Sequence, residues 1–320
     1  MAGSFLTWAP QQASAEAAKK LLVVTVTTSF RHSSIETAEK VLAQLGADSG
    51  AFTVDFVHQP EGQPKSPGRP PEAKPKESPE AFKARQSAYS EALAAFNQAQ
   101  GEFQEKVRAY MAEQMSMERL KQYDGFIFAN TTGNLMLPDP EGFIGLIEGG
   151  KAFIAMHSGS DTYHDFRPYS ATLGGEFKTH KAQVAVTPTI HDPQHPAVSH
   201  LPEGWTVFDE IYIIKTYDPS KTHGLLGLKA HPNEGTPGYY PVSWCKQVGQ
   251  GRVFYTSLGH REDVWDAEWN PDQRKNDPEI AKQYQQHILK GIQWALGQLE
   301  GSAQPNGMPP SAGDEPDAAQ

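Results

Sequence analysis

The chain is poor in cysteine, in long apolar runs and in clustered basic residues. Its 320 residues include one cysteine, Cys245, so a disulfide within the chain is excluded. Cys245 lies in the strand-like segment PVSWCK, where we expect a small buried apolar group and not an activated thiol. No run approaches the ~20 apolar residues that a membrane-spanning helix needs. The net charge of −10 argues against nucleic acid as a partner.

The apolar residues that are present follow the pattern of an α/β protein. They make up 38% of the chain, enough for a substantial core. Residues 21–27 predict a strand, a helix capped by Ser33 or Ser34 runs to Gly46, and residues 52–57 predict the next strand. Such strand, loop, helix units predict a parallel sheet with right-handed crossovers.

The same pattern, less regular after residue 157, predicts one α/β domain over residues 21–298. Further strands are expected at 124–129, 151–156, 183–187, 207–214, 224–228, 240–244 and 252–257, with helices at 140–148 and 278–296. Residues 299–320 lack apolar periodicity, which predicts a disordered tail. Residues 1–20 are a flexible start or the remnant of an export signal, so periplasmic and cytoplasmic locations both stay open.

Residues 59–117 are an insertion in this domain. Residues 59–79 are rich in Pro, Gly, Lys and Glu and predict a solvated linker. Residues 80–117 predict a long helix, because aromatic residues recur every seven positions, at Phe82, Tyr89, Phe96, Phe103 and Tyr110. Two interpretations stay open: the stripe packs on the parent domain, or the 80–117 helix is an arm that forms a homo-oligomer.

Three histidines follow short apolar runs. His157 follows KAFIAM, His32 follows LLVVTVTTSFR and His260 follows RVFYTSLG. Since ligands of open α/β sheets bind beyond the carboxyl ends of the strands, we expect these histidines to share a pocket. His180 and the pair Asp209-Glu210 are the next candidates.

Two chemistries fit these residue types. Imidazoles with a carboxylate are ligands of zinc or another divalent metal, and the candidate ligands are His157, His180 and His260. Without a metal, histidine titrates near neutrality and can move protons beside a carboxylate. The catalytic candidates are His157, His32, Asp161, Glu210 and His260, and the candidates for substrate binding are Tyr212, Asp209 and Trp244. No nucleotide cofactor is predicted.

Seven segments together resemble the ThuA-like, or trehalose-utilisation, family. They are TTSFRHSSI (27–35), GGKAFIAMHSGSD (149–161), GGEFKTH (174–180), HPAV (195–198), DEIY (209–212), PVSW (241–244) and GRVFYTSLGH (251–260). The resemblance implies a flavodoxin-like, doubly wound, mostly parallel sheet similar to class I glutamine amidotransferases, here with a helical insertion. In those enzymes the strand that matches residues 153–156 leads into a nucleophile elbow. Here His157 and Ser158 follow that strand and no cysteine does, which argues against glutamine hydrolysis.

The resemblance also implies a role in carbohydrate metabolism. Its small-molecule substrate would be a glycoside such as trehalose or a 3-keto-glycoside, and the enzyme would be a lyase or a hydrolase. The alternative is a non-catalytic sugar-binding or assembly module. Mutually hydrogen-bonded histidines that fill the pocket without a cavity would favour that alternative.

Overall fold

An eight-stranded sheet forms the centre of the structure, a computed structural model that describes residues 17–314. The strand order is β2-β1-β3-β4-β12-β11-β10-β7. The strands are β1 (Lys19–Val24), β2 (Phe52–Val57), β3 (Gly125–Ala129), β4 (Ala152–Met156), β7 (Thr189–Ile190), β10 (His223–Ala230), β11 (Pro237–Val248) and β12 (Gly251–Thr256). The first five strands in this order are parallel to one another, and the last three extend the sheet antiparallel. The parallel part has the flavodoxin-like order, which confirms the predicted fold class.

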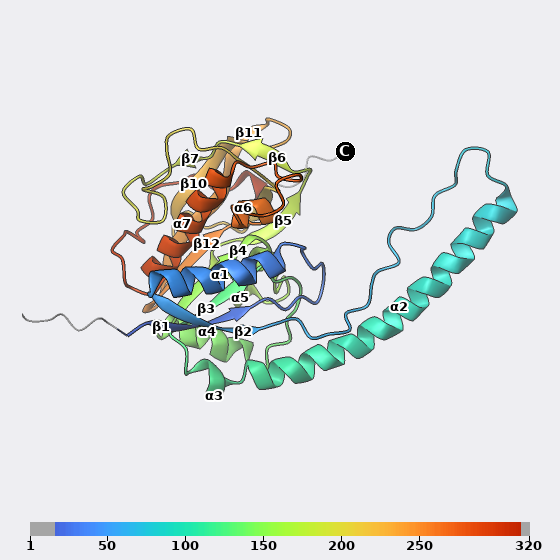
Figure 1. The fold of residues 1–320 in the computed structure, drawn as a ribbon, viewed down its shortest axis with the longest axis horizontal. Coiled ribbons are helices and arrows are strands. Elements are labelled where there is room, and N and C mark those ends of the chain that lie inside the picture. The colour runs from blue at the N-terminus through green and yellow to red at the C-terminus, as the bar shows by residue number, and fades with distance from the viewer. Residues whose placement is uncertain (1–16, 315–320) are drawn as a thin grey trace, which may run out of the picture.

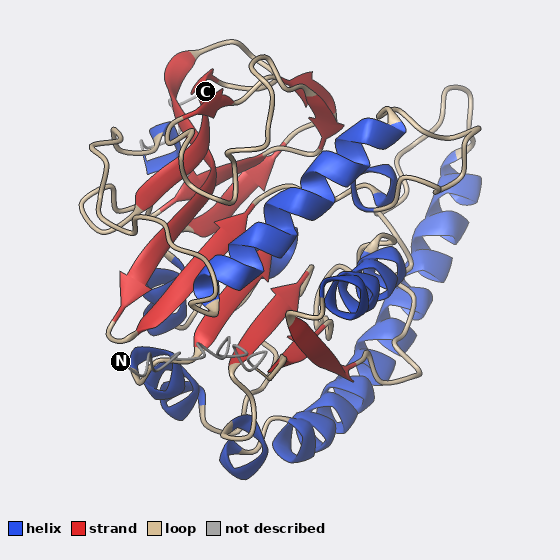
Figure 2. Cartoon of the chain, turned by 60° about the vertical axis from the view of Figure 1, so that its left-hand side comes forward, coloured by secondary structure: helices blue, strands red, loops and turns tan. Residues whose placement is uncertain are grey.

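Helices cover both faces of this sheet (Figure 2). Every residue of β3 and β4 is buried, which explains why these strands are continuous apolar runs. On one face Ile127 and Ile154 share a core with helices α1 (Ile35–Ser49), α6 (Glu262–Trp265) and α7 (Pro278–Ala295). On the other face Phe126 and Phe153 share a core with α4 (Pro140–Glu148), α5 (Arg167–Leu173) and the end of the long helix α2 (Pro79–Gln114). The short α3 (Met117–Leu120) leads from α2 into β3.

Two small sheets lie beside the large one. β5 (Glu176–His180) pairs with β9 (Tyr212–Lys215), and β6 (Val184–Val186) pairs with β8 (Val207–Asp209). The single strand expected over residues 207–214 is therefore two strands. The chain changes its pairing partner between β8 and β9, and Glu210 lies in the break.

The insertion is a projecting arm. Figure 1 shows the linker running out from the body and α2 (Pro79–Gln114) returning to it. Near the body Phe103, Val107 and Met111 are buried, whereas the outer aromatic residues are half-buried and Tyr89 donates a hydrogen bond to the carbonyl of Gly68 in the linker. The stripe thus packs partly on the domain and partly under its own linker, and a homo-oligomer formed through this arm stays a prediction. None of the helices within residues 17–314 has the length and apolarity to cross a bilayer.

The two halves of α2 should differ in their contribution to stability. Met111→Ala leaves a cavity where a fully buried side chain packs, and is expected to lower the free energy of unfolding by ~2–4 kcal/mol. Leu93→Ala, on the half-buried outer part of the same helix, should cost less than ~1 kcal/mol. Chemical denaturation of both variants measures the difference. Equal losses would mean that the arm is as tightly packed at its tip as at its base.

The described part of the C-terminal tail is packed on the domain. Asn306 exchanges two hydrogen bonds with the backbone of Gly224, and the hydroxyl of Ser311 donates to the carbonyl of Ile214. A 3₁₀ turn, η2 (Ala312–Asp314), follows. The expectation of a disordered tail therefore does not hold over residues 299–314, because polar side chains anchor it without apolar periodicity. Residues 1–16, where a signal remnant is expected, and 315–320 lie outside the described residues.

Candidate functional site

Four side chains meet at the carboxyl edge of the parallel strands: His32, His157, Glu210 and His260. One ligand atom from each lies within 4.8 Å of the others, and we call this group the tetrad. His32 follows β1, His157 follows β4 directly and His260 follows β12, while Glu210 enters from the break between β8 and β9. The structure thus brings the three histidines at strand ends together and adds one carboxylate.

His157 occupies a tight strand-to-helix turn. It begins the 3₁₀ helix η1 (His157–Asp161) with a φ of 46°, a left-handed conformation that side chains other than glycine seldom adopt. A Cβ on Gly159 would lie 2.8 Å from the Cβ of Ala155, so this turn needs glycine there. Nδ1 of His157 lies 2.8 Å from the carbonyl oxygen of Ser257 and donates to it. Nε2 therefore keeps its lone pair for the tetrad.

The distances within the tetrad match the edges of a small coordination polyhedron. Nε2 of His157 lies 3.3 Å from Nδ1 of His260, and Oε2 of Glu210 lies 3.3 Å from Nδ1 of His260 and 3.8 Å from Nε2 of His157. The ring of His32 stands edge-on to both other rings, at 4.8 and 5.2 Å between centroids. Ligands of a tetrahedral ion with bonds of ~2.1 Å are ~3.4 Å apart, close to the shorter contacts.

Burial keeps two of the imidazoles neutral. Burial, with the neighbouring His260 and His180, lowers the pKa of His32 to about 3. Burial, with His32 and His260, also lowers the pKa of His157 well below its ordinary value. Burial opposes a charge on His260 too, but the carboxylates of Glu210 and Asp209 outweigh it and raise the pKa of His260. Neutral imidazoles with free lone pairs are the form that binds a metal.

Asp209 holds the loop that carries His260. Its fully buried carboxylate accepts backbone N–H bonds from Gly259 at 2.7 Å, His260 at 3.3 Å and Arg261 at 3.2 Å. Burial raises the pKa of Asp209 to about 6 despite these bonds, which lower it. The amide of Asn130 donates to the carbonyl of Gly259 from the other side. Asp209, expected to bind substrate, thus contacts this loop and positions His260.

His180 and Tyr212 each contact one member of the tetrad. Nδ1 of His180 lies 2.9 Å from Oε1 of Glu210, the carboxylate oxygen that the tetrad leaves free. The structure therefore places His180, expected as a metal ligand, against the carboxylate and not among the four ligand atoms. The buried ring of Tyr212 lies 4.2 Å from the ring of His157 and packs against it. Tyr212 thereby limits the movement of the imidazole.

Two neighbouring residues of β11 belong to the core. Trp244 is fully buried and its indole N–H donates to the carbonyl of Leu173, so the ring has no face open to the substrate it was expected to bind. Cys245 is fully buried, as predicted, and burial raises the pKa of its thiol well above the ordinary value. It is therefore not an activated nucleophile.

Asp161, a catalytic candidate, belongs to a separate ionic group. His164 lies between two carboxylates, with Nε2 2.6 Å from Asp161 and Nδ1 2.6 Å from Glu176, which also pairs with Lys215 at 2.8 Å. This group ties the turn after His157 to the small sheet of β5 and β9. The sequence interpretation missed His164, which follows no apolar run. It also missed Asn130, which directly follows the buried strand β3 and shares that signal with His157.

The stability that His164 contributes should depend on pH. Hydrogen bonds to Asp161 outweigh burial and, with those to Glu176, raise the pKa of His164 to about 9. A raised pKa in the folded state stabilises the protein fully below the unfolded pKa of ~6.5, and the contribution disappears as pH rises through about 9. The melting temperature of wild type should therefore exceed that of His164→Gln most at pH 6 and no longer at pH 10. A difference that stays constant over this range would contradict the charged assignment.

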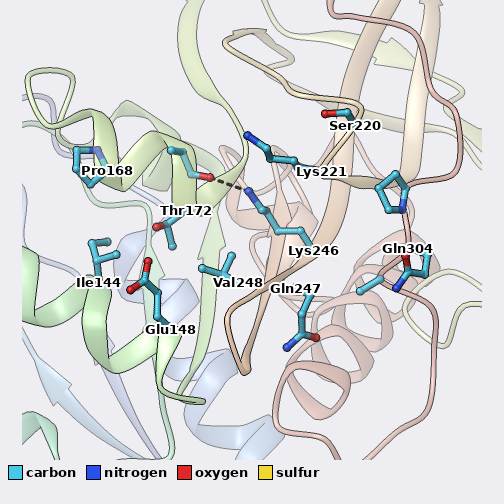
Figure 3. A pocket seen from close by; sticks show the side chains of 13 residues that line it. Ile144, Glu148, Pro168, Thr172, Ser220, Lys221, Lys246, Gln247, Val248 and Gln304 are labelled. Carbon is cyan, nitrogen blue, oxygen red and sulfur yellow. Dashed lines mark hydrogen bonds between the residues drawn. The ribbon is translucent and has the colours of Figure 1, made fainter.

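A cavity lies at the opposite edge of the sheet, at the amino ends of β4 and β12. It measures about 470 Å³, and Figure 3 shows Lys221 and Lys246 on one wall and Glu148 on another. Burial lowers the pKa of Lys246 to about 8, and its ammonium group donates to the carbonyl of Ala171. Within residues 17–314 no group of potential metal ligands like the tetrad occurs here or elsewhere. We therefore place the candidate site at the carboxyl edge.

Fold and site define a flavodoxin-like α/β protein with a histidine cluster at its strand-to-helix elbow. The family model named ThuA and described as trehalose utilisation matches residues 78–295, and the chain belongs to this family. Two solved structures share the fold, ThuA-like proteins of Parabacteroides merdae and Bacteroides uniformis. The first is 15% identical over 92% of this chain and 96% of its own, with a TM-score of 0.58; the second is 16% identical over 92% and 98%, with a TM-score of 0.57. Among curated proteins no relative matches the chain.

Proposed function

We propose that this protein is a carbohydrate-processing enzyme that eliminates the aglycone of a 3-keto-glycoside at a divalent metal site, with zinc as the metal. The observation that supports the proposal most is the tetrad, in which three imidazoles and a carboxylate bring their ligand atoms within 4.8 Å of one another. Membership of the ThuA family supports carbohydrate as the substrate class.

The residues fit such an ion. His32, His157 and His260 supply three nitrogen ligands, and catalytic zinc sites use three protein ligands with a further position for substrate or water. Nδ1 of His157 donates to Ser257, which fixes the ring as outer hydrogen bonds fix metal-binding histidines. A bound zinc ion would act as a Lewis acid that polarises the ketone oxygen of the substrate.

Glu210 is the general base in this proposal. Its Oε2 faces the imidazoles, and its Oε1 is held by His180 at 2.9 Å, so the carboxylate has a fixed orientation. It removes the proton from carbon 2, which the neighbouring ketone at carbon 3 acidifies. The electron pair becomes the second bond of a double bond between carbons 1 and 2, the bond from carbon 1 to the glycosidic oxygen breaks, and Glu210 delivers its proton to the departing oxygen. The step is an elimination without net oxidation or reduction.

A non-catalytic sugar-binding module is the alternative, and one contact favours it. Nε2 of His157 and Nδ1 of His260 are close enough for a direct hydrogen bond, which such a module would contain. However, the carboxylate of Glu210 contacts both rings, and a cavity of about 900 Å³ reaches His32. A carboxylate among imidazoles beside a cavity supports the enzyme more than the module.

The direct test is a substrate comparison. Zinc-loaded protein incubated with 3-keto-trehalose should release glucose and form an unsaturated ketone with ultraviolet absorbance, while trehalose should stay intact because its carbon 2 proton is not activated. Chromatography and absorbance measure the two products. Release of glucose from trehalose at an equal rate, or no release from the keto form, would refute the elimination.

A further inference from the structure

A cavity of about 900 Å³ lies between the loop that carries His32 and the inserted arm. This volume is within the range of ~300–1,000 Å³ for small-molecule sites. The body contributes residues of the segment 28–36 to its lining, the linker contributes residues 63–66, and α2 contributes Phe96, Gln100 and Gln104. The insertion thus forms one wall of a cavity that reaches His32, one member of the tetrad.

Hydrogen bonds fasten this wall to the loop before His32. The amide of Gln63 donates to the carbonyl of Ser29 at 3.3 Å, and the amide of Gln100 donates to the carbonyl of Thr28 at 3.5 Å. The side chain of Gln59, at the start of the linker, accepts from the backbone N–H of Thr27 at 2.7 Å and donates to the carbonyl of Thr27 at 3.0 Å. Linker and helix are therefore held at fixed places relative to the site.

An exposed aromatic ring marks the body side of the cavity. Phe30 is 64% exposed, and no other large apolar side chain of residues 17–314 is exposed in this way. Its ring packs edge-on against His32, with 4.9 Å between centroids. Phe96 on α2, which is half-buried, lines the opposite wall. An exposed apolar group in a cavity costs free energy unless a ligand covers it.

The remaining lining is suited to a neutral, hydroxyl-rich ligand. Three amide side chains, those of Gln63, Gln100 and Gln104, line it. Gln63 and Gln100 each use one N–H for the bonds above and keep a second N–H and a carbonyl lone pair for a ligand. The charged side chains of the lining have both signs, Arg31 and Lys65 against Glu36, so the lining is not a dedicated anion site. Aromatic rings with amides match the apolar faces and the hydroxyl groups of a sugar.

We infer that this cavity is the subsite for the second sugar ring of a disaccharide substrate, with the ring stacked between Phe30 and Phe96. The inference rests on the proposed function, since the reacting ring occupies the tetrad while its partner extends past His32. The inserted arm then selects the substrate, because the wall that α2 and the linker form contacts a second sugar ring. A glycoside with one sugar ring lacks this contact.

Binding measurements test the subsite without turnover. Calorimetry on the zinc-loaded full chain uses trehalose and methyl α-glucoside as probes, with wild type and the variants Phe30→Ala, Phe96→Ala and Phe82→Ala. Phe82 lies on the same aromatic stripe of α2 outside the cavity lining, so Phe82→Ala is the matched control. Melting curves confirm that each variant is folded.

Wild type should bind trehalose about 10-fold more tightly than methyl α-glucoside. Phe30→Ala and Phe96→Ala should each remove most of this difference and leave methyl α-glucoside binding unchanged, while Phe82→Ala should bind both sugars as wild type does. Equal binding of the two sugars by wild type, no binding of either, or unchanged trehalose binding by both cavity variants would overturn the inference. Binding through Phe30 and Phe96 without turnover of any keto-glycoside would keep the subsite and refute the proposed function instead.

Discussion

Replacing Glu210 by Gln is expected to lower the turnover number for a 3-keto-glycoside by about 10²–10⁴-fold. The amide has nearly the shape of the carboxylate and can still contact His180, but it cannot accept the proton from carbon 2. The Michaelis constant should change little, because the variant loses proton transfer and not substrate contacts. Steady-state kinetics on zinc-loaded protein measures both constants.

The matched control for this variant is Glu234→Gln. Glu234 is an exposed carboxylate paired with Lys181, and it lies outside the tetrad. Its replacement should leave the turnover number within about twofold of wild type. A Glu210→Gln variant that retains wild-type turnover would show that another group takes the proton.

Replacing Asp263 by Ala is expected to lower the free energy of unfolding by about 3–5 kcal/mol. The carboxylate is fully buried and forms an ion pair with Arg261 at 2.8 Å. It also accepts the backbone N–H groups of Lys275 at 2.6 Å and Asn276 at 3.0 Å, so its removal leaves the guanidinium without its carboxylate and these two backbone donors without their acceptor. Chemical denaturation near pH 7 measures the loss.

The pH dependence of this contribution has a definite sign. Burial alone would raise the pKa of Asp263, but its bonds to Arg261 and to the two backbone groups outweigh burial and lower it. The stabilisation is therefore present above the unfolded pKa of ~3.9 and disappears as pH falls through the lower, folded pKa. Asp272→Ala, which replaces an exposed aspartate in the loop after α6, is the control and should cost less than ~0.5 kcal/mol. Equal losses in the two variants would contradict this account of Asp263.

The fold could be predicted from the sequence because buried parallel strands are continuous apolar runs. The segments 124–129 and 151–156 show this pattern, and the structure places strands at both. The run 207–214 looks like one strand, yet β8 and β9 pair with different partners, and this choice depends on distant segments. The packing of residues 299–314 could not be predicted from the sequence pattern either, because single polar side chains such as Asn306 anchor this segment.

Part of the site could also be predicted, because three of its residues follow predicted strands. His32, His157 and His260 follow strands, so the topology of the sheet brings them to one edge. Glu210 was a weaker candidate, since its place at that edge depends on the break between β8 and β9. The separation of Asp161 from the tetrad depends on His164, and no local pattern indicates which carboxylate a histidine will contact.

The most direct test of the central claim, that the three histidines of the tetrad hold a metal ion, is the zinc content of the purified full-length protein. After dialysis against zinc and then against metal-free buffer, wild type should retain one equivalent per chain. The variant His157→Ala should retain far less, because even the loss of a hydrogen bond to a metal ligand costs about 10–100-fold in affinity. His58→Ala, which removes a largely exposed histidine paired with Glu39, should bind as wild type does. Retention of a full equivalent by His157→Ala, or no stoichiometric zinc in wild type, would contradict the account.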